Sequence, residues 1–226
     1  MLKTYSIIIP ARNEGHRIEH TILSVRKLRP YAEVILADGG SVDETVERAG
    51  ALGVAIVRSK SGRGTQCNAG ARQAGGEILL FLHADCLLPA NALSILEEYF
   101  QNPRLQIGTF RLGFDEAHWL LRAYASFTRF DSMFTRFGDQ CIVVRKSFFD
   151  RLGGFPDWPL FEDVQFLQAA RRHTKIVSFP ATVVTSARRF MRLGILRTQW
   201  INVRLFTRFL LKTPPEKLAE IYYGGA

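Results

Sequence analysis

Short apolar runs alternate with amphipathic stretches through the first half of the chain. The runs predict strands because they are brief, rich in isoleucine, leucine and valine, and end at proline, glycine or aspartate. The stretches between them carry apolar residues at helical spacing, as Ile18, Ile22 and Val25 do. The expected strands are 5–10, 34–37, 55–57 and 77–82, and the expected helices are 17–28, 41–52, 64–74 and 90–100.

Two local features refine this alternation. Ser41, followed by Glu44, predicts a capping box at the start of the second helix. The run 77–82 is apolar at nearly every position, which is typical of a strand covered on both faces of its sheet. Repeated strand–helix units predict an α/β fold, with a mostly parallel mixed sheet and helices on both faces.

The second half of the chain is less regular. We expect strands over 107–114 and 140–144, and helices over 119–130, from about Ser147, and over 161–172. Gly153 and Gly154 break the pattern between the last two helices. Since neither an internal repeat nor a low-complexity linker interrupts the chain, we predict one domain over residues 1–190 and a helical extension over 191–226.

Residues 191–212 form an amphipathic pattern of their own. On a helical wheel, Arg197, Arg204, Arg208 and Lys212 fall on one stripe, and apolar residues cover most of the remaining surface. A basic stripe beside a broad apolar face is typical of a helix that lies on a membrane surface. A helix packed on its own domain, or on a second subunit in a homodimer, explains the pattern equally well.

Polar residues gather where the predicted strands end. The first strand runs into Pro10 and Glu14, the second into Asp38, and the fourth into His83 and Asp85. Ligands of doubly wound sheets bind beyond the carboxyl ends of the strands. The sequence therefore predicts a ligand site at this edge of the sheet.

Charge narrows the range of ligands. The formal net charge is +9 over 226 residues, and the excess lies in residues 119–212, whereas residues 1–118 are balanced. A basic surface attracts phosphates and anionic lipid head groups. Nucleic acid is excluded as the expected partner, because the chain shows no recognisable nucleic-acid-binding module.

The cysteines and the first residues of the chain indicate in which cellular compartment the protein is expected. Cys67, Cys86 and Cys141 are far apart and odd in number, which favours a reducing environment over a disulfide framework. The first residues do not have the pattern of a signal peptide, and the apolar runs are too short to span a membrane. We expect a cytoplasmic protein that makes, at most, peripheral contact with the inner face of the cell membrane.

Five sequence blocks occur in an order and at separations that resemble the family 2 glycosyltransferases. They are SIIIPARNE (6–14), ADGGSVDET (37–45), RGTQCNAGARQAGGEILLFLHAD (63–85), GDQCIVVRKSFFDRLGGF (138–155) and FEDVQFLQAARR (161–172). FLHAD followed by GDQ looks most like a small bacterial subgroup labelled arsenosugar-biosynthesis glycosyltransferases. The resemblance implies a GT-A (nucleotide-diphospho-sugar transferase) fold and inverting sugar transfer from a nucleotide-sugar.

The resemblance also implies a nucleotide site. Asp38 would accept a hydrogen bond from the base. Taken alone, Asp38 and Gly39 are better explained as an ordinary Asp-Gly turn, but together with the other blocks the base contact is favoured. Arg63, ahead of a helix, suits a diphosphate. Asn68 has ordinary helix packing as an equal alternative. The expected nucleotide-binding residues are Pro10, Ala11, Arg12, Glu14, Asp38, Gly39, Arg63, Asn68 and Ala84.

Asp85 is the expected metal ligand. Most members of the family carry DxD here, and the last aspartate binds Mn²⁺ or Mg²⁺ at the donor diphosphate. In this chain His83 takes the first position, so that only Asp85 matches. One carboxylate with phosphate oxygens and water suffices for such ions. For Asp85 the alternative is a helix cap. His83 would bind the metal, orient Asp85 or contact the ribose; a half-buried, hydrogen-bonded histidine is favoured over a direct metal ligand.

The pair Glu162–Asp163 matches the family's ED motif. By resemblance, Asp163 is the base that takes the acceptor proton, and Glu162 supports it. The alternative is a pair of acids that interacts with the helix dipole. Asp139 and Gln140 are expected on the acceptor side. Arg188 and Arg189 would stabilise the leaving diphosphate or simply belong to the basic surface.

Together these features predict a metal-dependent, inverting glycosyltransferase that uses a UDP-sugar in preference to a GDP-sugar. The acceptor would be a hydroxyl compound, lipid-linked or anionic. One alternative is a catalytically inactive protein that binds nucleotide-sugars. Another is a sugar-1-phosphate nucleotidyltransferase, which is disfavoured because the first strand is not followed by a glycine-rich loop.

Overall fold

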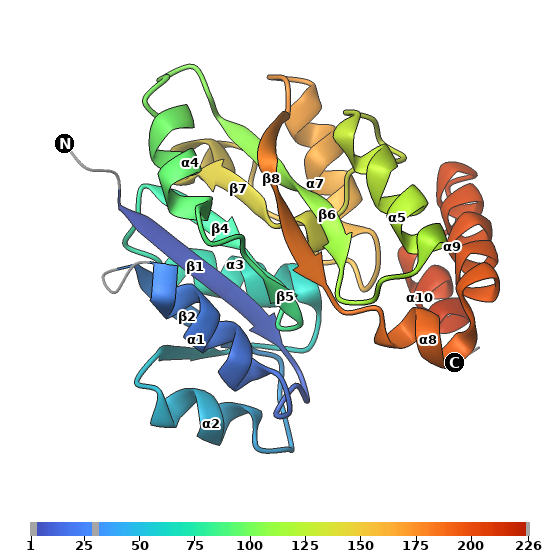
Figure 1. The fold of residues 1–226 in the computed structure, drawn as a ribbon, viewed down its shortest axis with the longest axis horizontal. Helices are drawn as coiled ribbons and strands as arrows, with labels where there is room; N and C mark the ends of the chain where they lie inside the picture. The colour runs from blue at the N-terminus through green and yellow to red at the C-terminus, as the bar shows by residue number, and fades with distance from the viewer. Residues whose placement is uncertain (1–3, 29–31, 225–226) are drawn as a thin grey trace.

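A computed structural model describes residues 4–28 and 32–224 (Figure 1). Its centre is a mixed, eight-stranded sheet in the order β3-β2-β1-β4-β7-β6-β8-β5. The strands are β1 (Tyr5–Ala11), β2 (Glu33–Asp38), β3 (Ala55–Arg58), β4 (Ile78–Phe81), β5 (Cys86–Leu87), β6 (Ile107–Phe114), β7 (Ile142–Arg145) and β8 (Val177–Thr185). The predicted α/β fold with a mostly parallel mixed sheet is confirmed.

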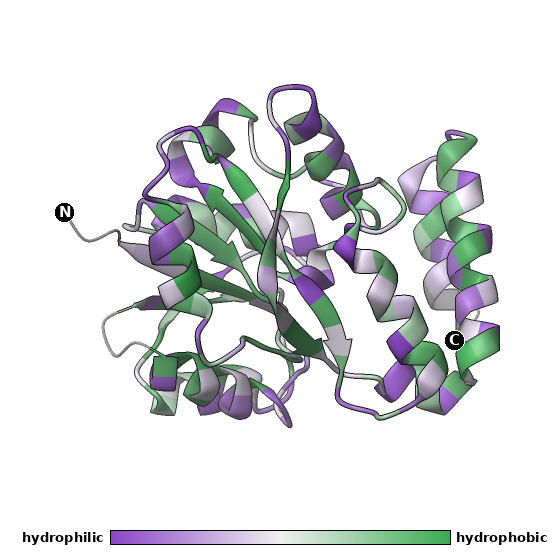
Figure 2. Cartoon of the chain, turned by 45° about the horizontal axis from the view of Figure 1, so that its top comes forward, coloured by the Kyte–Doolittle hydropathy of each residue, from purple (hydrophilic) through white to green (hydrophobic). Residues whose placement is uncertain are grey.

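Helices cover both faces of the sheet. Ile7 and Ile9 of β1 join one core cluster and Ile8 joins the other, because successive strand residues point to opposite faces. The hydropathy colouring shows that the strands are largely apolar, whereas the helices mix apolar and polar residues (Figure 2). The first cluster includes α1 (Ile18–Leu28), α2 (Thr45–Ala51) and α4 (Ala92–Tyr99), and the second includes α3 (Arg63–Gln73), α6 (Lys146–Arg151) and α7 (Glu162–Arg171).

Strand direction brings distant segments to one edge of the sheet. β1 runs parallel to β2 and β4, whereas β7 runs antiparallel to β4 and pairs Ile142 with Phe81. The residues that precede β7 therefore lie beside those that follow β4. They form a short 3₁₀ helix, η2 (Gly138–Gln140). We call this edge, where β1, β2, β3, β4, β6 and β8 end, the carboxyl edge.

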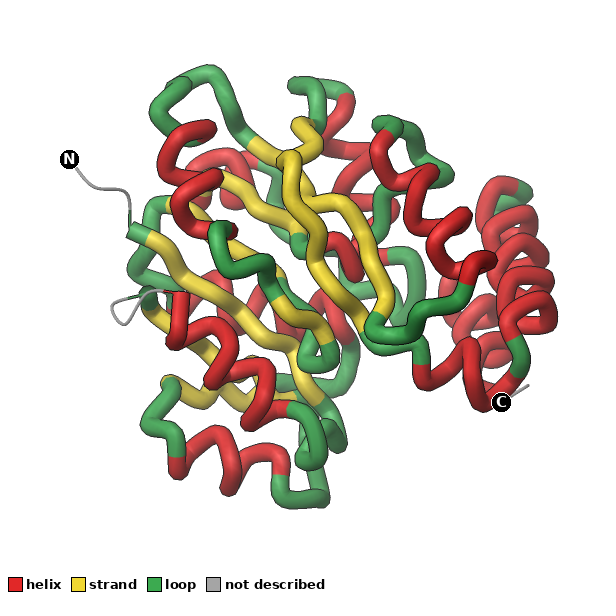
Figure 3. The backbone as a smooth tube through the Cα atoms, viewed as in Figure 1, coloured by secondary structure: helices red, strands yellow, loops and turns green. Residues whose placement is uncertain are grey.

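Four further helices lie beyond β6 and β8. The connection after β6 leads to α5, and the one after β8 leads to α8 on the same side (Figure 3). The helix expected over 191–212 is in fact two helices, because Gly194 takes a φ of 85° between them. The domain boundary expected after residue 190 falls inside α8. The helices are α5 (Trp119–Ser126), followed by η1 (Phe127–Arg129), and α8 (Arg188–Leu193), α9 (Ile195–Leu210) and α10 (Pro215–Gly224). Of the described helices, none has both the length and the apolar character needed to cross a bilayer.

Two local features differ from expectation. The sequence did not predict β8, because Pro180 interrupts its apolar pattern; the β6–β8 register shifts between Thr109 and Arg111, which accommodates the interruption. The capping box at Ser41 was wrong. α2 begins at Thr45, and the Ser41 hydroxyl accepts a hydrogen bond from the backbone N–H of Asn13 instead.

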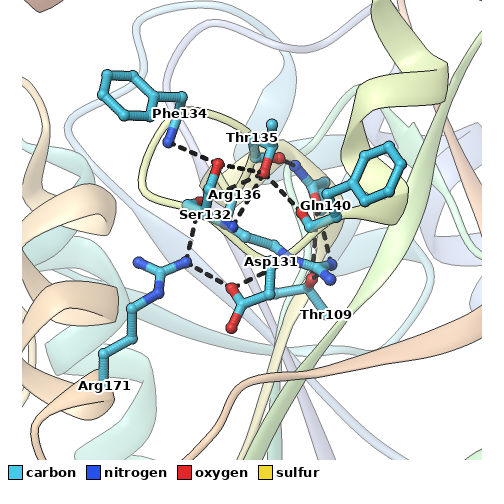
Figure 4. A network of polar contacts seen from close by, with 9 residues as sticks. Thr109, Asp131, Ser132, Phe134, Thr135, Arg136, Gln140 and Arg171 are labelled. Carbon is cyan, nitrogen blue, oxygen red and sulfur yellow. Dashed lines mark hydrogen bonds and ion pairs between the residues drawn. The ribbon is translucent and has the colours of Figure 1, made fainter.

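A buried arginine fixes the loop that leads into η2. Arg136 is 1% exposed and donates to Thr109 Oγ1 at 2.5 Å. Its Nε lies 3.7 Å from Asp131 Oδ1, and Arg171 Nη2 lies 2.8 Å from the same oxygen (Figure 4). Asp131 thus compensates two cations, one of them almost fully buried. The sequence pattern did not single out this network.

Replacing Asp131 with asparagine is expected to destabilise the protein by about 2 kcal/mol, because it leaves the buried Arg136 without its carboxylate. The effect stays below that of a fully buried pair, since the Asp131 side chain is 34% exposed. Urea unfolding measures the change. The exposed Asp150 is the matched control, and Asp150→Asn should change stability by less than about 0.5 kcal/mol. Equal stability of the two variants would contradict this role of Asp131.

Candidate active site

A cleft of about 560 Å³ opens at the carboxyl edge, next to the C-terminal helices. Residues from four separate segments line its inner part: the turn after β4, η2, the first turn of α7 and the start of α3. We call this part the acidic end. Its members are Arg63, His83, Asp85, Asp139, Glu162 and Asp163. The predicted metal, acceptor-side and base carboxylates therefore share one cleft.

The Asp163 carboxylate is held in place by two backbone N–H groups. Its Oδ2 accepts from Gly138 at 2.5 Å, and its Oδ1 accepts from Val164 at 2.7 Å. A Cβ on Gly138 would lie 3.1 Å from Asp163 Oδ2 and 3.2 Å from His83 Nε2. Because residue 138 is glycine, the Asp163 carboxylate and the His83 imidazole can both lie close to its backbone. Asp163 is 9% exposed, so its side chain reaches the cleft from a fixed position.

Strained backbone precedes the acidic pair. Phe161 takes a φ of 62°, in the left-handed region that bulky residues avoid at a cost of about 1–2 kcal/mol. Its ring packs on Phe206 and Phe209 of α9, with centroid distances of 5.8 and 4.8 Å. Backbone strain maintained by packing is frequent at functional sites. Here it sets the direction in which Glu162 leaves the loop and enters α7.

Glu162 faces Arg63 inside the cleft. Its Oε1 lies 3.5 Å from Arg63 Nε, and the Glu162 side chain is only 4% exposed. Burial raises the pKa of Glu162 to about 7, against the opposing effect of the Arg63 guanidinium. Near neutral pH this carboxyl can therefore exchange a proton.

The raised pKa of Glu162 predicts a pH-dependent stability. In the unfolded chain its carboxyl ionises near its usual value of 4.5, but in the folded protein it ionises near 7. The folded state therefore binds the proton more tightly, and stability falls as pH rises through this interval, by at most about 3 kcal/mol. Urea unfolding at pH 5 and pH 8, without divalent cations, should show a smaller fall for Glu162→Gln. Glu98→Gln, at an exposed site, should keep the native slope, and the same slope in all three proteins would contradict this assignment.

The donor set at Asp85 fits a hard divalent cation. Ligand atoms of His83, Asp85 and Cys86 lie within 4.8 Å of one another. Burial lowers the pKa of His83 to about 3, so its imidazole is neutral and has a nitrogen lone pair available. Burial raises the pKa of the Cys86 thiol, which donates to Thr185 Oγ1 at 3.2 Å and stays protonated. Carboxylate oxygens, with a neutral imidazole beside them, suit Mn²⁺ or Mg²⁺, whereas a protonated thiol does not.

Asp139 strengthens this fit. Its Oδ1 is buried without a hydrogen-bond partner. Burial, together with the nearby charges of Asp163 and Asp85, raises the pKa of Asp139 to about 7. A buried carboxylate that faces other carboxylates is unfavourable unless a cation compensates it. The acidic end therefore has an unsatisfied oxygen that a metal ion or a substrate hydroxyl would satisfy.

Arg188 connects the acidic end with the predicted nucleotide loop. Its Nη2 lies 2.6 Å from Glu14 Oε1 and 3.8 Å from Asp85 Oδ2. The sequence suggested a phosphate contact for both Arg188 and Arg189. Arg189 also lines the cleft, and its guanidinium lies over the ring of Tyr222, 3.8 Å from the centroid. Arg188 therefore lies beside the acidic end, whereas Arg189 lines the cleft at α10.

The predicted nucleoside residues lie at the ends of β1 and β2. The Asp38 carboxylate accepts from the N–H groups of Gly40 and Ser41, both at 3.1 Å, which is the Asp-Gly turn that the sequence left as an alternative. Arg12 Nη1 donates to Ser61 Oγ at 2.8 Å. Pro10, Ala11 and Ala84 are buried and offer mainly backbone atoms.

Gln66 was missed by the sequence reasoning. Its Nε2 donates to the carbonyl oxygens of Ala11 and Ala37, each at 2.8 Å, and so ties α3 to the ends of two strands. A Cβ on Gly39 would lie 2.8 Å from the Gln66 side chain, which explains the glycine by close packing. A polar residue on the buried face of an otherwise small-residue helix was the available signal.

Two predicted site residues have structural roles instead. Gln140 was expected on the acceptor side, but it is fully buried and donates to the Thr135 carbonyl at 2.6 Å. It therefore cannot present its amide to an acceptor. Asn68 bonds to both backbone polar groups of Phe155, at 2.8 and 2.9 Å, which fixes the chain ahead of α7. This geometry favours the packing alternative for Asn68.

The sheet order and the acidic cleft at its carboxyl edge define the class of fold: GT-A, that of the nucleotide-diphospho-sugar transferases. TarS of S. aureus in complex with UDP shares it, with a TM-score of 0.69 and 16% identity over 81% of this chain and 60% of that one. The mannosyltransferase PcManGT from Pyrobaculum calidifontis, in complex with GDP-Man and Mn²⁺, has a TM-score of 0.67 and 18% identity over 100% of this chain and 70% of that one. At these identities the likeness concerns the fold.

Residues 6–152 match the family described as glycosyl transferase family 2, and the chain belongs to this family. It is 30% identical to the undecaprenyl-phosphate 4-deoxy-4-formamido-L-arabinose transferase of Pectobacterium atrosepticum, over 56% of this chain and 42% of that protein. It is also 30% identical to the 4,4'-diaponeurosporenoate glycosyltransferase of Staphylococcus aureus, over 60% of this chain and 38% of that protein. The matched segments thus span about two fifths of these relatives. The narrower resemblance to the arsenosugar subgroup stays a prediction.

Proposed function

We propose that the protein transfers a sugar, with inversion, from a UDP-sugar to a hydroxyl acceptor, and that it needs a divalent metal ion. One observation carries the proposal: the structure brings Asp85 and Asp163, from segments far apart in the sequence, into one cleft at the carboxyl edge. Acidic residues that converge at this edge are difficult to explain as helix caps alone, because buried carboxylates raise the free energy of the folded state.

Asp163 is the proposed base. Inverting transfer needs a carboxylate that takes the acceptor proton while the acceptor oxygen attacks the anomeric carbon. The Gly138 and Val164 N–H groups each hold one Asp163 oxygen, at 2.5 and 2.7 Å, and so fix the direction of the carboxylate. Glu162, paired with Arg63, is the proposed supporting acid that keeps this part of the cleft polar.

Two arginines and the metal would act on the donor diphosphate. A Mn²⁺ or Mg²⁺ ion on Asp85, with His83 as a further donor, would neutralise negative charge on the leaving nucleoside diphosphate. Arg188, between Glu14 and Asp85, lies where a diphosphate would join the nucleotide loop to the metal site. Arg63 provides a second cation at the N-terminus of α3.

Asp38 is the proposed contact for the uracil base. Its carboxylate already accepts two backbone N–H groups, which holds it in place while lone pairs remain for an imide N–H. The solved structures that share the fold include complexes with both UDP and GDP-Man, so they are compatible with either nucleotide. The preference for UDP therefore rests on Asp38.

A thermal-shift panel of nucleoside diphosphates tests the donor assignment. With Mn²⁺ present, UDP should raise Tm more than GDP or ADP, and the Asp38→Ala variant should lose this selectivity. Asp150→Asn, an exposed site outside the cleft, should respond like the native protein. Equal shifts with UDP, GDP and ADP would refute the role of Asp38, and the absence of any nucleotide response would refute the donor site itself.

A further inference from the structure

The outer part of the cleft is lined by aromatic side chains, and we call it the aromatic end. One group consists of Phe114, Tyr124 and Phe190, with centroids 5.4 to 6.3 Å apart. The other is centred on Phe206 of α9, whose ring lies 5.4 Å from Phe134, 6.2 Å from Phe137 and 5.8 Å from Phe161. Of these seven aromatic residues, Phe134 is exposed and the other six are half-buried. The described cleft thus offers ring surface to a bound molecule.

The aromatic end continues onto the exposed surface of α9. Val203 and Leu210 line the cleft, although they are 63% and 44% exposed. Trp200, also largely exposed, lies one helical turn from Val203 on the same face. An apolar path therefore leads from the acidic end, past the aromatic rings, to the outside of the molecule.

Polar groups are unevenly distributed along this path. Burial raises the pKa of the Tyr124 hydroxyl, and the charges of Asp139 and Asp163 raise it further, so that this hydroxyl stays protonated and able to donate. Farther out, α9 contributes Thr198, Gln199, Asn202 and Thr207 to the lining. The hydroxyls of Thr198 and Thr207 already donate to the carbonyl oxygens of Gly194 and Val203, each at 2.9 Å. A sugar needs hydrogen-bond partners around its whole rim, and this lining would leave many of its hydroxyls unpaired.

We propose that the cleft binds an amphipathic acceptor, with its hydroxyl end at Asp163 and its apolar body along the aromatic end. This inference rests on the proposed function and adds the class of the acceptor. The apolar body gains affinity by leaving water, roughly in proportion to the area it buries. The hydroxyl end places the reacting oxygen at the acidic end.

Alkyl glucosides of increasing chain length test this inference. We expect calorimetric affinity, measured with UDP and Mn²⁺ present and below micelle-forming concentrations, to rise at least tenfold from butyl to decyl glucoside. Val203→Asn should remove most of this gain, and because Val203 is largely exposed the variant should fold. Val42→Asn, at a residue that is 91% exposed and outside the cleft, is the matched control.

The outcomes separate the acceptor inference from the donor assignment. If affinity does not depend on chain length while UDP still raises Tm, the acceptor inference is wrong and the proposed function stands. If glucose binds as tightly as decyl glucoside, the aromatic rings serve sugar stacking and the inference is also wrong. If UDP has no effect on Tm, the proposed function itself fails.

The exposed face of α9, part of which also borders the cleft, carries a second inference. Leu196, Trp200 and Val203 are 72%, 63% and 63% exposed and lie on one face, which Leu211 extends. Arg204 lies beside them, with its guanidinium 5.6 Å from the centre of the Trp200 ring. An apolar face with an arginine flank is complementary to a bilayer with anionic head groups. The basic excess of residues 119–212 adds to this attraction.

We infer that this face of α9 lies on an anionic membrane surface. Vesicles of phosphatidylcholine with about one third phosphatidylglycerol should bind at least tenfold more protein in flotation than pure phosphatidylcholine. The double variant Leu196→Ser/Trp200→Ser should lose this binding, and Val42→Ser should keep it. If native protein ignores the vesicles and sedimentation shows a dimer that the double variant dissociates, the face covers a second copy instead, and the inference is wrong.

Discussion

Replacing Asp163 with asparagine is expected to lower kcat for sugar transfer by about 10² to 10⁴, the usual contribution of a general base. The amide keeps the shape of the side chain, and its single oxygen can accept from only one of the Gly138 and Val164 N–H groups, but it cannot take the acceptor proton. Binding of UDP with Mn²⁺ should remain within about twofold of native, because the change leaves Asp38 and Asp85 intact. Steady-state kinetics with a saturating UDP-sugar measure the loss.

Glu162→Gln and Asp150→Asn complete this experiment. The first removes the neighbouring acid and should lower kcat less than Asp163→Asn does, since Glu162 supports the site without taking the proton. The second changes an exposed carboxylate outside the cleft and should leave kcat unchanged. If Asp163→Asn keeps native kcat while it binds UDP normally, another group is the base.

Replacing Asp85 with asparagine is expected to abolish the effect of Mn²⁺ on UDP binding and to lower kcat/KM at least about 100-fold. Loss of the carboxylate removes the proposed charged ligand, and an amide oxygen holds a hard cation less strongly. Titration of UDP with and without Mn²⁺ measures the first effect. In the native protein the metal should tighten binding, whereas in Asp85→Asn the two titrations should coincide.

His83→Asn separates the two candidate ligands. The place of His83 at the acidic end suggests that it only adds a donor or orients Asp85. In that case Mn²⁺ should still tighten UDP binding in the variant, but less than in the native protein. A complete loss in His83→Asn with a normal response in Asp85→Asn would reverse the assignment and make the imidazole the principal ligand.

Much of the fold was predictable from periodicity. The strand expected over 5–10 is Tyr5–Ala11, and the strand expected over 107–114 was found with those bounds. These strands are easy to predict because their sequence pattern differs from that of a helix within a few residues. A strand covered on both faces is apolar throughout, and a half-buried strand alternates apolar and polar residues. β8 was not predicted, because Pro180 interrupts its apolar pattern. The interruption is accommodated by a shift in the register between β6 and β8, which the sequence alone does not reveal.

Site residues could be predicted where a short sequence motif identifies them. Asp85 and Asp163 were named from local motifs, and the structure brings them into one cleft. The buried Gln140 was misplaced because burial depends on Arg136 and its loop, which no local pattern reveals. The aromatic end was missed for a similar reason: its rings come from segments that meet only in the folded chain.

The most direct test of the account follows the fate of the donor by proton NMR. Native protein with Mn²⁺, a UDP-sugar and decyl glucoside is expected to release UDP and to form a glycoside whose anomeric configuration is opposite to that of the donor. Asp163→Asn should give neither product at a comparable rate. A product that keeps the donor configuration, or no release of UDP above the Asp163→Asn level from any UDP-sugar that the protein binds, would contradict an inverting glycosyltransferase.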